Sequence, residues 1–122
     1  MILALVVGVV AGIGAVARYV VDQVVSHRYP STWPWGTFVI NVTGSFVLGL
    51  VTGLATHHGL STNASVVLGT GFAGGYTTWS TLMLEATTFA DDGHHIHATI
   101  TVATSLVAGL TAAAIGLSLA LI

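Results

Sequence analysis

The sequence predicts an all-α membrane protein in which four transmembrane helices form one domain and the third helix is broken at mid-membrane. Of the 122 residues, 54% are hydrophobic and only 5% are charged, and the mean hydropathy is +0.93. A water-soluble fold of this composition would have almost no charged surface to present to solvent. The scarcity of charge also leaves four apolar runs of about 20 residues, the length that crosses a bilayer.

Four spans are predicted, at about residues 2–25, 35–56, 64–89 and 96–122, and nothing in the sequence divides residues 1–122 into further domains. Only Arg18 and Arg28 provide a positive-inside bias, which permits either orientation in the membrane. The chain has no basic patch of the kind that binds nucleic acid. It has no cysteine for a disulfide or a thiolate metal site. Four helices rich in small residues enclose little interior, so we expect an oligomer.

Two charged residues, Arg18 and Asp22, lie one turn apart near the end of the first span. Residues four apart share a helix face, so we expect these side chains to pair and lower the cost of charge near hydrocarbon. A pair that only extends toward the interface is the plainer interpretation. A direct role in function is the alternative.

Polar residues on the second and fourth spans each follow a helical spacing and fall on one side of their helix. Hydrogen bonding between helices is one explanation of such a stripe. A polar track for an ion or solute is the other, and an asparagine in mid-span is more than packing requires. The stripe of the second span is Thr37, Asn41, Ser45, Gly49, Thr52 and Thr56, and that of the fourth is His97, Thr101, Thr104, Ser105 and Thr111.

The third span contains the stretch Gly71 to Thr81, which is rich in glycine and threonine. Each glycine costs about 1 kcal/mol relative to alanine in a helix interior, and threonine hydroxyls can divert backbone hydrogen bonds. Carbonyls released there would suit a hard cation such as sodium, provided that a second subunit supplies the remaining ligands. A straight helix with a close glycine contact, made by Gly71 and Gly75, is the alternative.

The polar stripes of the second and fourth spans favour passage of a small anion. Hydroxyl and amide protons line the stripes, and no ring of acidic or basic residues accompanies them. The edge of an aromatic ring carries positive partial charge, so Trp79 is a second candidate contact for an anion. Packing in the protein interior is the commoner fate of such a ring.

Three segments resemble the Fluc (CrcB) family of fluoride channels. They are Gly36 to Phe46, reading GTFVINVTGSF; Gly71 to Thr81, reading GFAGGYTTWST; and Gly12 to Tyr19, reading GIGAVARY. Their order and spacing extend the resemblance over the whole chain.

The resemblance implies four-helix subunits that pair antiparallel as dual-topology dimers in the cell membrane. It implies two narrow fluoride pores and one structural sodium ion at the dimer axis, held by the backbone carbonyls of Gly74 and Thr77 from both subunits. The expected function is passive export of cytoplasmic fluoride, which confers fluoride resistance and involves no enzymatic step. Arg18 matches the family arginine, with a structural role. The expected pore-lining residues are Asn41, Trp79, Ser80, Thr81 and Leu82, to which the polar stripes add Thr37, Ser45, Thr101 and Ser105.

One departure from the family pattern concerns the aromatic residues of the pore. The family usually has two phenylalanines three residues apart, where this chain has Trp79 and Leu82. A homodimer would then lack one ring in both pores. A heterodimer with a homologous subunit, in which this chain is a half-pore or non-conducting partner, is therefore the alternative. A small proton-coupled exporter is a weaker one, since Asp22 and Glu85, its only candidate carboxylates, are expected near span ends.

Overall fold

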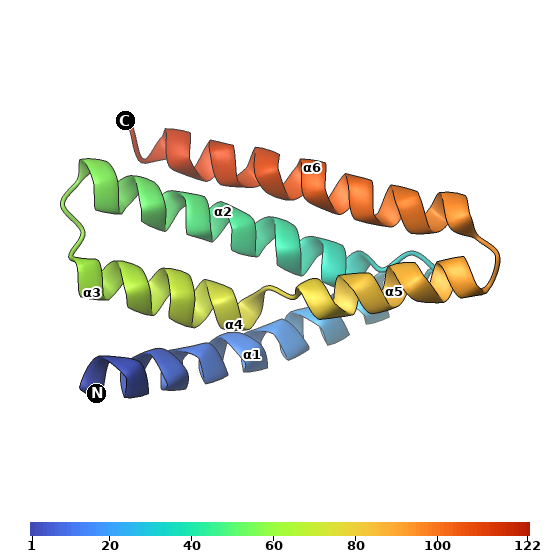
Figure 1. Cartoon of the computed structure of the whole chain (residues 1–122), viewed down its shortest axis with the longest axis horizontal. Coiled ribbons are helices and arrows are strands. Elements are labelled where there is room, and N and C mark those ends of the chain that lie inside the picture. Colours follow the sequence, from blue (N-terminus) through green and yellow to red (C-terminus); the bar gives the residue numbers. More distant parts are fainter.

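The computed structural model describes all 122 residues and consists of helices joined by short connections (Figure 1). This confirms the predicted all-α class with four helices, of which the third is broken. The elements are α1 (Ile2–Arg28), α2 (Trp35–His57), α3 (Thr62–Ser65), the π-helical segment η1 (Val66–Ala73), α4 (Gly74–Tyr76), α5 (Trp79–Asp91) and α6 (His95–Leu119).

Three helices, α1, α2 and α6, are long and apolar enough to cross a membrane, with mean hydropathies of 2.1, 1.8 and 1.9. The fourth crossing is divided: α3, η1 and α4 follow one another without interruption, and α5 begins after two extended residues. Both termini and the connection between α2 and α3 lie at one end of the molecule (Figure 1). The other two connections lie at the opposite end, so that each helix or divided helix traverses the molecule once.

Bulky apolar side chains cover the outside of the molecule. Only 21 of the 122 residues are buried, whereas Leu5 and Leu110 are 67% and 72% exposed. In water this surface would drive aggregation, but in a bilayer it faces hydrocarbon while the helices satisfy their own backbone groups. The chain is an integral membrane protein.

Small residues allow α2 and α6 to pack closely along their length. A methyl group at Gly116 of α6 would come within 2.9 Å of the Leu50 backbone nitrogen on α2. On the facing side, Gly49 lies directly against the backbone of Ala113. Since lipid removes most of the hydrophobic driving force between helices, such close backbone contact is what holds them together.

Glycines also bring α1 against the first half of the broken helix, and this changes their predicted role. Gly75 lies against the backbone of Ala11, and a methyl group at Gly71 would come within 3.3 Å of the Val7 carbonyl oxygen. The break lies within the predicted stretch Gly71 to Thr81, but it is short: the helix continues through Tyr76, and only Thr77 and Thr78 leave it. The predicted break and the alternative of a close glycine contact therefore both occur, in adjacent segments.

Candidate functional site

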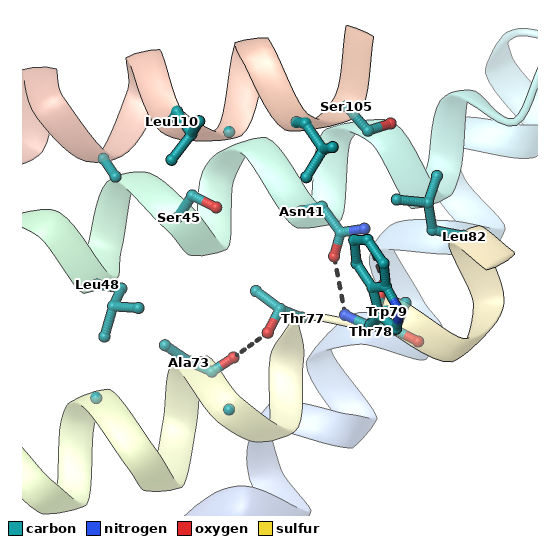
Figure 2. A pocket seen from close by; sticks show the side chains of 15 residues that line it. Asn41, Ser45, Leu48, Ala73, Thr77, Thr78, Trp79, Leu82, Ser105 and Leu110 are labelled. Atoms are coloured by element: carbon teal, nitrogen blue, oxygen red, sulfur yellow. Dashed lines mark hydrogen bonds between the residues drawn. The ribbon is translucent and has the colours of Figure 1, made fainter. Parts of the chain in front are cut away.

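The break in the third helix consists of two extended residues. Thr77 has φ −75° and ψ 160°, and Thr78 has φ −147° and ψ 119°. Neither residue needs the left-handed conformation, so threonine is compatible with both positions. The break opens beside Asn41 of α2, which faces Thr78 across a narrow space (Figure 2).

The side chain of Asn41 bonds the backbone of Thr78 twice. Thr78 N–H donates to Asn41 Oδ1 at 2.8 Å, and Asn41 Nδ2 donates to the Thr78 carbonyl oxygen at 2.9 Å. In a continuous α-helix the Thr78 N–H would instead bond the carbonyl of Gly74, four residues earlier. Asn41 thereby releases the Gly74 carbonyl while keeping the polar groups of Thr78 satisfied, as a hydrocarbon environment requires.

The carbonyl of Thr77 is released in a similar way. Thr78 caps α5, because Thr81 N–H donates to Thr78 Oγ1 at 3.2 Å. That N–H would bond the Thr77 carbonyl if the helix were continuous. The Thr77 oxygen instead accepts from Arg18 Nη1 on α1, at 3.4 Å.

The break leaves the four carbonyls from Gly74 to Thr77 without their usual helical donors, and the two predicted to bind sodium are among them. Gly74 is exposed, and both Gly74 and Thr77 line a groove on the surface of the chain. Carbonyl oxygens are hard ligands suited to a cation such as sodium. The residues present fit such a cation only in part, because two carbonyls from one chain make an incomplete ligand set.

The groove has a volume of about 410 Å³ and lies between α2, the broken helix and α6 (Figure 2). Trp79 is 59% exposed, whereas Leu82 is only 3% exposed and packs into the chain. No hydrogen bond within the chain engages the hydroxyls of Ser45 and Ser105, which leaves them available to a ligand. The groove brings together seven of the predicted site residues: Asn41, Ser45, Gly74, Thr77, Trp79, Leu82 and Ser105.

The other predicted site residues lie outside this groove. Thr101 is fully buried, and its hydroxyl donates to the His97 carbonyl of its own helix at 2.8 Å. Ser80 is exposed, with its hydroxyl 3.3 Å from that of Thr78. Thr81 and Arg18 line a smaller cavity of about 190 Å³ between α1, α2 and the start of α5. Roles of these residues in a pore stay predictions.

The expected pairing of Arg18 with Asp22 gives way to other contacts. Arg18 turns toward the break and bonds the Thr77 carbonyl. The carboxylate of Asp22 packs against the α-carbon of Gly36. Any side chain at position 36 would displace this carboxylate. The two residues share the wall of the smaller cavity, but each meets a different element because α2 and the broken helix lie on either side.

Glu85 is the residue whose contacts the sequence did not predict. It was expected near a span end, and it lies in α5, the second part of the divided crossing, about two turns beyond the break. Thr37, which is 2% exposed, donates to Glu85 Oε1 at 2.8 Å. The other oxygen, Oε2, is buried without a partner. The spacing of Thr78, Thr81 and Glu85 could have placed this carboxylate on the same face as the polar residues of the break.

Comparisons with known proteins bear on this arrangement. The model of a family described as CrcB-like protein, Camphor Resistance (CrcB), matches residues 5–117. A protein of Leifsonia xyli named fluoride-specific ion channel FluC 1 is 50% identical over 113 residues, which cover 93% of this chain and 82% of that protein. Fluoride-specific ion channel FluC 2 of Mycobacterium tuberculosis is 42% identical over 107 residues, or 88% of this chain and 82% of the relative. FluC 1 of Streptomyces avermitilis is 44% identical over 110 residues, or 88% and 89%.

Proposed function

The chain belongs to the CrcB family, and we propose that it is a fluoride-selective passive channel that exports cytoplasmic fluoride down its electrochemical gradient. The groove beside the break carries this proposal. It presents the amide of Asn41 and the free hydroxyls of Ser45 and Ser105 in otherwise apolar surroundings. Such neutral donors can replace part of the hydration shell of a small anion.

Passive flux is sufficient for export. A membrane potential contributes about 2.3 kcal/mol per elementary charge per 100 mV, which corresponds to roughly a fortyfold concentration ratio. A negative cell interior therefore drives the anion outward without a chemical reaction, and the protein acts as a channel rather than as an enzyme.

The conducting unit is a dimer of antiparallel subunits with dual topology, and the incomplete ligand set at the break supports this. The carbonyls of Gly74 and Thr77 would hold one structural sodium ion together with their counterparts from a second subunit. Its fixed positive charge would make a low-dielectric region more favourable for an anion. The weak positive-inside bias from Arg18 and Arg28 is compatible with insertion in both directions.

A heterodimer is the second candidate, and Leu82 is the observation that favours it. Its side chain is nearly fully buried within the chain, and it offers no ring edge to an anion. In that arrangement a homologous subunit supplies the missing aromatic residue, and this chain contributes one half of the pore.

Fluoride efflux from liposomes that contain only this chain tests the proposal, with chloride as the control anion. We expect fluoride efflux with strong rejection of chloride. Equal efflux of both ions would contradict it. Efflux that appears only with a homologous subunit would support the half-pore alternative, and efflux that requires a pH gradient would favour a proton-coupled exporter.

The substitution Leu82→Phe is expected to raise fluoride efflux of the chain alone by roughly two- to tenfold, since it restores a ring whose edge carries positive partial charge and can face an anion. Leu84→Phe is the control, because Leu84 is 66% exposed on the same helix. The initial efflux rates of both variants are compared with that of the unsubstituted chain. A rate for Leu82→Phe no higher than for Leu84→Phe would show that the missing ring does not limit conduction.

A further inference from the structure

Tyr76 is the last helical residue before the break and is almost completely buried. Its exposed fraction is 8%, and its ring stacks on that of Phe72 one turn earlier, with centroids 5.7 Å apart and planes inclined by 9°. The hydroxyl oxygen lies 2.9 Å from Thr43 Oγ1 of α2. This contact joins α2 and α4 through two residues that are 33 positions apart in the sequence.

The direction of this hydrogen bond follows from the other contact of Thr43. The Thr43 hydroxyl has a single proton, which it donates to the Val39 carbonyl oxygen at 2.7 Å. Tyr76 must therefore donate its own proton to Thr43 Oγ1. The tyrosine hydroxyl is thereby held in one orientation, and the contact depends on both side chains.

The Tyr76–Thr43 contact and the bonds between Asn41 and Thr78 require the same alignment of α2 with the segment around the break. Thr43 follows Asn41 by two residues on α2, and Tyr76 precedes Thr78 by two residues. A shift of one segment along the other by a single residue would break both contacts. Gly44 keeps the segments close, because its α-carbon lies directly against the methyl group of Thr77.

We propose that the Tyr76–Thr43 hydroxyl pair positions the break, and hence the Thr77 and Thr78 backbone, for fluoride conduction; the inference rests on the proposed channel function. Neither hydroxyl lines the groove. Both are positioning residues, because they act through the backbone of the two residues that follow Tyr76. Without the pair, α4 can slide or rotate relative to α2, which misplaces the amide of Asn41.

Three variants test the pair. Tyr76→Phe removes the donor and is expected to lower fluoride efflux by roughly two- to tenfold. Thr43→Val has the larger effect, because it leaves the part-buried tyrosine hydroxyl without a partner. The double variant removes both polar groups and should conduct better than Thr43→Val alone. Thr43→Ser, which keeps the hydroxyl, should behave as the unsubstituted chain.

Thr87→Val is the matched control. The Thr87 hydroxyl bonds the carbonyls three and four residues earlier in its own helix, at 2.9 and 3.0 Å, as Thr43 does, but it makes no hydrogen bond to another helix. We expect it to leave efflux unchanged. Equal efflux in Thr43→Val and Thr87→Val, or a double variant no better than Thr43→Val, would overturn the inference.

Hydrogen exchange separates this inference from the channel function. The amide of Thr78 should exchange roughly two- to tenfold faster in Tyr76→Phe, and faster still in Thr43→Val, while amides in α6 keep their rates. If the unsubstituted chain conducts neither alone nor with a homologous subunit, the channel proposal fails, but the exchange result still decides the positioning role. Unchanged exchange at Thr78 in Tyr76→Phe and Thr43→Val would contradict it.

Discussion

The substitution Asn41→Asp is expected to reduce fluoride efflux by roughly a hundredfold or more. An ionised aspartate can accept a hydrogen bond from Thr78 N–H but cannot donate to the Thr78 carbonyl oxygen. It would place a negative charge beside that carbonyl and in the path of an anion. Losing the donor and burying an unpaired charge together cost about 3 kcal/mol or more, which corresponds to the predicted change in rate.

The matched control for this substitution is Asn63→Asp. Asn63 is the other asparagine of the chain and is exposed in α3, away from the break. It introduces the same charge and should leave the efflux rate unchanged. The initial rates of the two variants are compared in liposomes with the same protein content. If Asn41→Asp stays within threefold of Asn63→Asp, the amide of Asn41 is neither a contact for fluoride nor a determinant of the break.

The sequence was sufficient to predict the fold class, the family and the existence of the break, because these depend on local patterns. Apolar runs of bilayer length predict helices from composition alone. The stripe on the second span identified Asn41 as unusual, and three motifs identified the family. The comparisons confirm that assignment.

The position of the break and the partners of the polar residues depend on contacts between distant segments. Glycine propensity predicted a weakened helix from Gly71 onward, but the glycines stay helical, because the contact of Gly75 with Ala11 on α1 outweighs a local cost of about 1 kcal/mol. Periodicity placed Thr101 on the polar face of its helix but could not show whether that face is open or covered. In the structure Thr101 is fully buried. The bonds between Asn41 and Thr78 span 37 residues, a separation that no local pattern encodes.

Gly14→Ala should cause the largest loss of stability among single methyl additions to α1. The new methyl carbon would lie 2.5 Å from the Phe72 carbonyl oxygen and 2.9 Å from the Tyr76 backbone nitrogen. Neither atom can rotate away, so α1 must separate from the broken helix. Overpacking of this kind costs about 1–3 kcal/mol, which a lower midpoint of thermal unfolding in detergent would report.

The same displacement should also lower fluoride efflux, because Arg18 lies one turn beyond Gly14 and reaches the Thr77 carbonyl from α1. Gly12→Ala is the matched control: it adds the same methyl group to the same helix, where no atom lies within 4 Å. A large effect of Gly14→Ala with a small effect of Gly12→Ala would show that α1 supports the break from within the chain. Equal effects would mean that the outer face of α1, which lipid or a second subunit covers, determines stability instead.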